Sequence, residues 1–418
     1  MVDVAVVGAG FAGLAAALDL HDAGVSVVVL EARERVGGRV LSVELENGEH
    51  AELGAEWIMP EDDVLQATID RLGLTASVAG IDYLRREPRG RGAVPVAELD
   101  AFLEAADAHL AASDADGSSM GAMLDAVPGD DRARAVAKAR LQGTFASDLD
   151  RVAWRAGWHS GRLAAEPAVY RRMARGNGSI GDAIAGLLPE VRLGVRATGV
   201  AERGGRVEVE TGDGRIEADA AVVAVPVRLV TELAFDPLLP PEQREAFEGL
   251  RMGVASKVAF PLGGEPERCA IQCADLPFWF WVADGADGRP RRVVTSFAGS
   301  ELPQEPLATA SGDPAAWVRR ISDLAPDLRL CVAVQVRADL VSLPHQHNVI
   351  PGLRRDGRGA REDGVSLVAV EEDQPVGGDV RAADAEVIAG RVLVGVVAAR
   401  EEVAGNGSGL AGHAVPEP

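Results

Sequence analysis

The chain of 418 residues carries 64 acidic and 42 basic side chains, which gives a formal net charge of −22. So acidic a surface disfavours nucleic acids and anionic membranes as partners. No apolar run reaches the roughly 20 residues of a membrane span, and a strand expected from Val2 leaves no room for a signal peptide. We therefore expect a cytoplasmic globular protein of two or three domains that binds neither nucleic acid nor membrane.

Lysine and cysteine are both scarce in this sequence. Lys138 and Lys257 are the only lysines among the 42 basic residues, so a lysine that remains suggests a task that arginine does not perform. Lysine is a compact charge that can lose its proton, whereas the guanidinium is a planar fork that stays charged. The three cysteines are too few for a disulfide framework or a zinc site, and we expect ordinary thiols at Cys269, Cys273 and Cys331.

The first 31 residues predict a strand–helix–strand unit. Residues 2–7 and 25–31 are short apolar runs typical of buried strands, and residues 11–22 have the pattern of a helix that ends at Gly24. A G-x-G-x-x-G motif lies between the first strand and the helix, which is the context that dinucleotide binding requires. Glycines there let the chain turn tightly and bring a pyrophosphate to the helix N-terminus. The motif consists of Gly8, Gly10 and Gly13.

The residues after the second strand narrow the choice of nucleotide. Glu31 ends that strand, where an acid usually binds a ribose hydroxyl and disfavours a 2′-phosphate. Gly37 and Gly38 then precede Arg39, which suits a long cofactor whose phosphates approach the backbone. Small residues within 52–58 are expected where a flat ring lies against the chain.

The remainder of the chain divides by its hydrophobic pattern. Residues 60–175 are mostly helical, and residues 191–225 alternate as short strands with tight turns between them. Further strands are expected at 254–260 and 291–297, and a helix at 313–326.

Three parts of the chain carry the motifs of one known family. The first comprises VAVVGAGFAGLAAALDLHDAGVSVVVLEARERVGGRV (residues 4–40) and ELGAEWI (residues 52–58). The second is VETGDGRIEADAAVVAVPVRLVTELAFDPLLPPEQREAF (residues 209–247), and the third is LRMGVASKVAF (residues 250–260). Together they resemble the flavin-containing amine oxidase family, which includes monoamine oxidases, L-amino-acid oxidases and polyamine oxidases.

This resemblance implies a fold and a division into domains. The fold would be α/β, with a GR2-type FAD-binding Rossmann domain and an inserted α+β substrate domain. The FAD-binding domain would be discontinuous and comprise residues 1–82, 176–240 and 385–418. The substrate domain would comprise residues 83–175 and 241–384.

The resemblance also assigns residues to FAD. Glu31 would bind the adenosine ribose, the glycine motif would hold the pyrophosphate with Arg33 and Arg39 alongside, and the segment 54–57 would run beside the isoalloxazine. The backbone of Ala197 would contact the adenine end. The residues expected to bind the cofactor are Gly8, Gly10, Phe11, Ala12, Gly13, Glu31, Ala32, Arg33, Gly37, Gly38, Arg39, Gly54, Ala55, Glu56, Trp57 and Ala197.

The implied reaction is oxidation of a C–N bond in a small amine or amino acid. The substrate gives a hydride to flavin N5, the imine is hydrolysed, and dioxygen re-oxidises the flavin with release of hydrogen peroxide. Lys257 occupies the position of the family's lysine, four residues after Gly253, and would be the catalytic residue that orients a water molecule at N5. The flavin performs the difficult step, while the protein supplies position and electrostatics.

The last 90 residues depart from the family and leave two alternatives open. No tyrosine follows Tyr170, and Val396 stands near the place of the family's late acid. The periodicity weakens beyond Leu330, and residues 351–364 read as a flexible loop. Either the tail has diverged, or the reading frame is altered from about Cys331. The protein could then be a flavin-dependent desaturase or dehydrogenase with another electron acceptor, or a degraded flavoprotein without activity.

The remaining aromatic residues suggest core positions. Trp279, Phe280 and Trp281 alternate along an expected strand, so they face both sides, and we favour core packing over a substrate cage. Trp154 and Trp158 lie four residues apart and are expected in a helical core. The histidines show no metal-ligand spacing, and we expect no metal.

Overall fold

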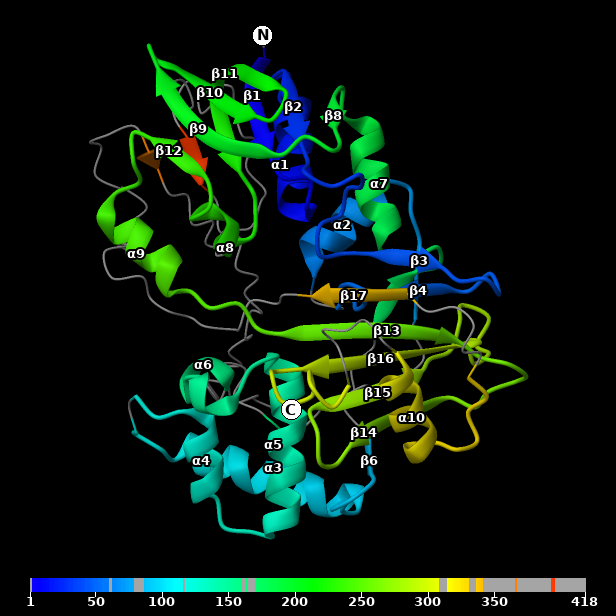
Figure 1. Ribbon diagram of the computed structural model, residues 1–418. Coiled ribbons are helices and arrows are strands. Elements are labelled where there is room, and N and C mark those ends of the chain that lie inside the picture. Colours follow the sequence, from blue (N-terminus) through cyan, green and yellow to red (C-terminus); the bar gives the residue numbers. More distant parts are fainter. Residues whose placement is uncertain are drawn as a thin grey trace, which may run out of the picture.

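The computed structural model contains two main β-sheets and a separate group of helices. In Figure 1 the first sheet lies at one end of the molecule, and the second sheet and the helical group lie at the other. Predictions for the tail, including Cys331, the loop at 351–364 and Val396, fall outside the described residues. The structure describes residues 2–59, 62–78, 86–115, 117–158, 163, 170–307, 314–330, 336–340, 365–366 and 392–394.

The first sheet contains the parallel strands of the predicted nucleotide-binding unit. Its strand order is β12-β9-β10-β11-β1-β2-β8, and β19 pairs with the last residues of β11 and with β18. β1 pairs in parallel with both β2 and β11, whereas β9, β10 and the first half of β11 form an antiparallel meander. The strands are β1 (Val2–Val7), β2 (Val27–Leu30), β8 (Val191–Arg192), β9 (Ala197–Arg203), β10 (Arg206–Thr211), β11 (Gly214–Val223), β12 (Ala234–Asp236), β18 (Val365–Ser366) and β19 (Val392–Val394).

Helices cover both faces of this sheet, which is why its central strands are continuously apolar. On one face Val4 packs with Leu14 of α1 and Ile180 of α7. On the other face Val7 packs in a cluster with Phe247 of α9. The helices are α1 (Phe11–Asp22), α7 (Gly178–Leu187), α8 (Val227–Val230) and α9 (Pro241–Gly249).

The second sheet has strand order β17-β13-β16-β15-β14-β6 and presents two different faces. One face packs on α10 through a cluster that includes Phe280 and Trp317. Lys257, Phe297 and Trp279 are directly paired on neighbouring strands, so they share the opposite face. The elements are β6 (Glu87–Arg89), β13 (Ala255–Pro261), β14 (Cys269–Cys273), β15 (Phe278–Val282), β16 (Val293–Gly299), β17 (Val336–Leu340) and α10 (Ala315–Leu324).

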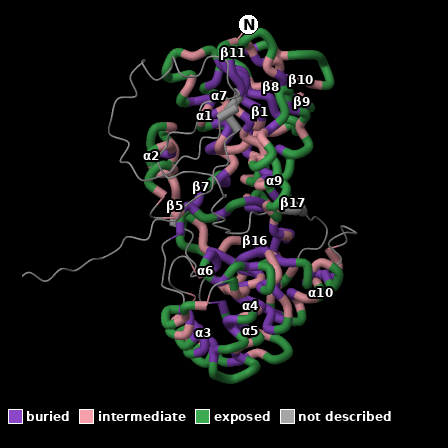
Figure 2. Tube along the Cα trace, turned by 90° about the vertical axis from the view of Figure 1, so that its left-hand side faces the viewer, coloured by how far each residue is buried: buried purple, intermediate pink, exposed green. Residues whose placement is uncertain are grey.

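The helical group has its own apolar core. Trp154 is buried there, and its ring lies 6.1 Å from that of Trp158, which confirms their predicted place in a helical core. Figure 2 shows the buried residues concentrated along the central strands and the inner sides of these helices. The helices are α3 (Val96–Ala111), α4 (Met120–Ala126), α5 (Asp131–Phe145), η1 (Leu149–Arg151) and α6 (Trp154–Gly157).

The structure departs from the sequence prediction mainly between residues 60 and 175. Besides helices, this segment contains three strands of three residues each, which are too short for hydrophobic alternation to reveal. Within the described part of the chain, no helix is both long enough and apolar enough to cross a membrane. The remaining elements are α2 (Asp63–Arg71), β3 (Ser42–Glu44), β4 (His50–Glu52), β5 (Ala76–Val78) and β7 (Arg171–Met173).

Candidate active site

The turn between β1 and α1 is shaped by contacts within the protein. Gly8 has φ +108°, and a Cβ there would lie 2.7 Å from the carbonyl oxygen of Ala224. A Cβ on Gly13 would lie 1.9 Å from the carbonyl oxygen of Gly8. Both positions therefore require glycine for packing, whether or not a nucleotide binds.

Gly10 differs from its two neighbours in the motif. A Cβ there would meet nothing closer than the Cα of Gly38 at 4.0 Å, and the residue has an ordinary φ of −71°. The space above it is open on the side where α1 begins. The first turn of α1 has no capping side chain and no acidic residue, so its N–H groups can receive an anion. A dinucleotide pyrophosphate fits this cradle.

Glu31 lies beside the same turn, at the carboxyl end of β2. Its carboxylate accepts hydrogen bonds from the backbone N–H groups of Ala9 and Arg33, both at 2.9 Å. The carboxyl end of a parallel strand is where open α/β sheets bind ligands. Val195 donates its N–H to the Glu31 carbonyl at 2.9 Å, which brings the start of the strand bearing Ala197 to this end of the site.

The second glycine pair packs against the turn. The N–H of Gly37 donates to the carbonyl of Ala9 at 2.8 Å, and a Cβ on Gly38 would lie 3.0 Å from the Cα of Gly10. The side chains of Arg33 and Arg39 are exposed: that of Arg33 reaches the Gly38 carbonyl at 3.4 Å, and that of Arg39 forms no hydrogen bond with any described residue. The structure thus brings most of the expected cofactor residues together, with Phe11 and Ala12 in the first turn of α1 and Ala32 in the loop after β2.

The segment from Gly54 to Trp57 alternates in burial. Packing within the protein already requires glycine at position 54, because an added Cβ would lie 2.1 Å from the Arg39 carbonyl oxygen. A flat ring against the backbone, the expected reason, is not needed to explain this glycine. Ala55 and Trp57 are exposed, the latter by 39%. Glu56 points the other way and is 4% exposed, so its side chain is directed into the protein.

Glu56 and Lys257 form a buried ion pair. Lys257 lies on β13, is 3% exposed, and donates from Nζ to Oε2 of Glu56 at 2.8 Å and to the Gly54 carbonyl at 3.2 Å. The other carboxylate oxygen, Oε1, accepts from Nε1 of Trp281 at 3.2 Å and lies 3.5 Å from Nη1 of Arg172. The catalytic lysine that the sequence predicted therefore contacts the segment expected beside the flavin ring. The resemblance gave Glu56 to the cofactor, but its carboxylate binds this lysine.

The neighbouring charges keep Glu56 ionised. Burial on its own would raise the pKa of the carboxyl. The positive charges of Lys257 and Arg172, together with the hydrogen bonds from Lys257 and Trp281, outweigh burial and hold the pKa of Glu56 below its usual value. One carboxylate thus faces two cations inside the protein.

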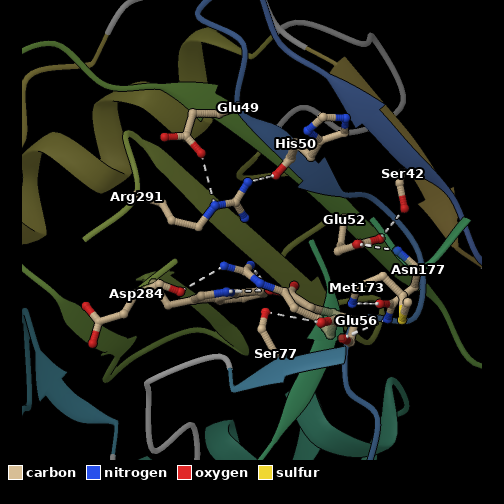
Figure 3. Close-up of polar contacts among 12 residues, drawn as sticks. Ser42, Glu49, His50, Glu52, Glu56, Ser77, Met173, Asn177, Asp284 and Arg291 are labelled. Carbon is tan, nitrogen blue, oxygen red and sulfur yellow. Dashed lines mark hydrogen bonds and ion pairs between the residues drawn. The ribbon is translucent and has the colours of Figure 1, made fainter. Parts of the chain in front are cut away.

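A second buried carboxylate supports the same segment. Glu52 accepts from the hydroxyl of Ser42 at 2.6 Å and from the backbone N–H of Asn177 at 2.7 Å (Figure 3). Asn177 in turn donates its side-chain amide to the carbonyl of Glu56 at 2.9 Å. Burial is the main cause that raises the pKa of Glu52 above the usual carboxyl value.

Glu52, Arg172 and Asn177 could not be predicted from the sequence, because their partners are distant in the chain. Glu52 and Asn177 are 125 residues apart, and Arg172 lies on a three-residue strand. The alternation of ELGAEW gave a usable signal, since it predicts that Glu52, Gly54 and Glu56 share one side. Figure 3 shows a related pair close by, in which Arg291 lies between Glu49 and the His50 carbonyl.

Aromatic side chains form a wall next to the ion pair. The rings of Trp279 and Trp281 stack with centroids 4.1 Å apart, and Trp57 lies 6.0 Å from the first and 6.4 Å from the second. Tyr170 lies 5.7 Å from Trp57. The Nζ atom of Lys257 is 5.1 Å from the Trp281 ring centroid.

The expectation of core packing is confirmed for all three residues, since Trp279 and Trp281 are 4% and 2% exposed and form a buried cluster with Tyr170. Phe280 packs in the core beneath α10, whereas Trp279 and Trp281 face the side of the sheet that carries Lys257. Hydrophobic alternation predicts opposite faces but does not say which face meets a site. For the described residues, no group of histidine, cysteine or acidic side chains could hold a metal ion.

Comparison with known proteins identifies the family. The family model for flavin containing amine oxidoreductases matches residues 11–342. Polyamine oxidase 3 of Oryza sativa subsp. japonica is 30% identical over 285 residues, which are 60% of this chain and 58% of that protein. (S)-6-hydroxynicotine oxidase of Paenarthrobacter nicotinovorans is 28% identical over 303 residues, which are 65% of this chain and 71% of that protein. The chain spans less than two thirds of the length of the polyamine oxidases it matches.

Solved structures agree with this assignment at the level of the fold. A putrescine oxidase bound to putrescine has a TM-score of 0.68 at 22% identity, over 82% of this chain and 89% of the other. Cyclohexylamine oxidase from Brevibacterium oxydans has a TM-score of 0.66 at 18% identity, over 82% and 88%. The fold is therefore the mixed α/β fold of flavin-dependent amine oxidases. With four fifths of its length matched by the family model, the chain belongs to the flavin containing amine oxidoreductases, whose cofactor is FAD.

Proposed function

We propose that this protein is an FAD-dependent oxidoreductase that oxidises a C–N bond of a small amine or amino acid, with dioxygen as the electron acceptor. The observation that carries the proposal is the position of Lys257, buried on β13 and bonded to the segment 54–57. FAD, when bound, would accept the hydride from the substrate carbon and pass the electrons on. The protein's own residues would bind, orient and exclude water.

The nucleotide half of the cofactor suits the first sheet. The N-terminus of α1 above Gly10 would hold the pyrophosphate, with Arg39 free to approach it from the side. Glu31 is already fixed by two backbone N–H groups and would bind the ribose hydroxyls. Ala55 and Trp57, which face outward from their segment, would border the ring.

Lys257 has the donors for the role we give it. Its ammonium carries three N–H groups, and two of them bond Gly54 and Glu56 within the described residues. The third would hold a water molecule toward the ring. Because Glu56 holds the ammonium in place, the charge would be in position before the substrate arrives.

We also propose a discontinuous domain organisation, with residues 1–82, 176–240 and 385–418 forming the FAD-binding domain. The parallel pairing of β19 with β11 supports the inclusion of the last segment. Residues 83–175 and 241–384 would form the substrate domain.

Two glycine variants test cofactor binding against a matched control. Gly10→Ala places a methyl group into the open space of the cradle, so we expect a folded protein that loses most of its flavin absorbance. Gly13→Ala collides with the Gly8 carbonyl and should lower the melting temperature even without FAD. Both melting temperatures are measured on apoprotein, and flavin content is read from the visible spectrum. A Gly10→Ala variant with wild-type flavin affinity would contradict this site.

Turnover is tested with the flavin-loaded protein and a panel of amines in air. Amine-dependent hydrogen peroxide release supports the proposal. Flavin reduction by an amine without peroxide would indicate a dehydrogenase that uses another acceptor. A protein that stays colourless after FAD is added would overturn the proposal for this chain.

A further inference from the structure

Arg86 is a buried arginine that the proposed chemistry does not use. It lies directly before β6 and is 6% exposed. Its Cζ atom lies 4.1 Å from the ring centroid of Trp279, so the guanidinium stacks on the indole. Its Nε atom is buried without a hydrogen-bond partner. Across the described residues, no carboxylate pairs with this side chain and no acceptor receives its N–H groups.

Such an arrangement is costly for a cation. A guanidinium is normally buried only with a carboxylate or several acceptors around it. A neighbouring charge has the same sign: Arg140 donates to the backbone carbonyl of Arg86 at 2.8 Å and to Gln272 at 2.7 Å. Burial first, and the charge of Arg140 second, lower the pKa of Arg86 to about 9. Among the described residues, the Arg86 guanidinium has no carboxylate partner to offset these effects.

The position of Arg86 links it to the candidate active site. The guanidinium and the ring of Trp281 each lie 4.1 Å from the centroid of Trp279, so they stack on its opposite faces. Trp281 in turn donates to Glu56, the partner of Lys257. Arg86 therefore ends the same aromatic wall that begins at the catalytic lysine.

We propose that Arg86 binds a carboxylate of the substrate, so that the enzyme acts on amines that also carry a carboxylate and disfavours diamines and polyamines. This inference rests on the proposed oxidation of a C–N bond. The planar fork of a guanidinium matches a carboxylate in two parallel hydrogen bonds. A second ammonium group at the same place would meet the positive charges of Arg86 and Arg140 instead.

Three substrates of equal carbon length test the preference in the flavin-loaded enzyme. They are 4-aminobutanoate, butylamine and 1,4-diaminobutane, with phenylalanine and phenethylamine as a second pair in which the carboxylate lies next to the amine. We expect kcat/KM to be higher for the carboxylate-bearing member in at least one set, by about 10- to 100-fold, as for a hydrogen bond between charged groups. A preference for 4-aminobutanoate would place the bound carboxylate far from the oxidised C–N bond. A preference for phenylalanine would place it next to that bond.

Substitution of Arg86 then assigns the preference to this residue. Arg86→Gln should abolish the preference for the carboxylate-bearing substrate, chiefly by raising the KM of that substrate. Arg86→Lys should keep part of the preference, because the positive charge remains without the planar fork. Arg91→Gln is the matched control, since Arg91 is exposed five residues later in the chain. Melting temperatures and flavin content of all three variants are measured in parallel.

Binding gives a readout that does not depend on turnover. Butanoate carries the carboxylate without the amine, and its binding to the holoenzyme should change the fluorescence of Trp279 beneath Arg86. Arg86→Gln should weaken this titration at least tenfold, while Arg91→Gln should not change it.

The outcomes separate this inference from the proposed function. If the wild type oxidises 1,4-diaminobutane as well as it oxidises 4-aminobutanoate, and phenethylamine as well as phenylalanine, Arg86 has no such role although the oxidase function stands. The same conclusion follows if Arg86→Gln keeps the wild-type ratio and only melts at a lower temperature, which would make the stack on Trp279 purely structural. If no amine of either class reduces the flavin, the proposed function itself fails.

Discussion

Replacement of Glu56 by glutamine removes the carboxylate that bonds Lys257 and lies beside Arg172 in the described part of the chain. Glu56 lies 2.8 Å from the Lys257 ammonium and 3.5 Å from the Arg172 guanidinium. At an effective dielectric constant of about 20, these distances correspond to roughly 6 and 5 kcal/mol of attraction before desolvation is counted. Removal of one partner from a buried pair typically destabilises by about 3–5 kcal/mol, because the other charge stays buried. We expect Glu56→Gln to lower the free energy of unfolding by this amount.

The lysine variant provides the matched comparison. In Lys257→Met, Glu56 keeps its contacts with Arg172 and Trp281, so the expected loss is smaller, about 1.5–3 kcal/mol. The double variant should cost less than the sum of the two single variants by about 1–3 kcal/mol, since the second substitution removes a charge that the first left without a partner. Urea denaturation of the apoprotein measures the free energy of unfolding of the wild type, the two single variants and the double variant.

The pH dependence gives an independent check on the same pair. The pKa of Glu56 is below its ordinary value of 4.5 in the folded protein, so its stabilising effect is present above that value and is lost as the pH falls through the lowered pKa. The gap in stability between wild type and Glu56→Gln should therefore shrink at acid pH. The buried contact of Glu56 with Lys257 and Arg172 would be refuted if the losses in unfolding free energy of the two single variants simply added in the double variant. It would also be refuted if Lys257→Met lost more stability than Glu56→Gln.

Three further predictions concern single side chains. Lys257→Met should keep the visible flavin spectrum but slow flavin reduction by an amine, or its re-oxidation, by about tenfold or more in stopped-flow measurements; unchanged rates would remove the role of this lysine. The raised pKa of Glu52 means that the folded protein holds this proton more tightly than the unfolded chain, so stability falls as the pH rises through the window from 4.5 to the raised value. Melting temperatures measured over a series of pH values should show this decline for the wild type but not for Glu52→Gln. If both proteins gave the same profile, the raised pKa of Glu52 would be contradicted. Burial raises the pKa of the Cys273 thiol to about 12, so iodoacetamide at pH 8 should label Cys273 in urea but not in the native protein, as mass spectrometry would show.

The first sheet could be predicted from the sequence because its signals are local. The apolar runs at β1 and β2 and the helix between them follow from hydrophobic pattern and from the glycine motif. The helix over 11–22 agrees with α1, while the strand expected at 25–31 is shorter and covers Val27–Leu30. Short strands such as β5–β7 were missed, since three residues are too few for a period of two to be recognised.

The site was predictable only in part, because a motif locates a backbone and not a side-chain direction. ELGAEWI correctly brought residues 54–57 next to Lys257, yet the partnership of Glu56 with that lysine joins residues 201 positions apart. Trp279 and Trp281 are buried, as predicted, but alternation along the strand did not show that their face of the sheet also carries Lys257. Arg86 carried no signal at all, since its burial and stacking depend on tertiary contacts.

The packing of Gly8 and Gly13 has a consequence for how the cofactor is acquired. Both glycines pack against backbone atoms of the protein itself, so we expect the turn to keep its shape when a nucleotide binds. Little conformational entropy is then lost on binding, and the free energy of the phosphate contacts goes into affinity instead of into ordering a loop. An apoprotein of this kind should take up its cofactor rapidly after folding, as a preformed receptor does.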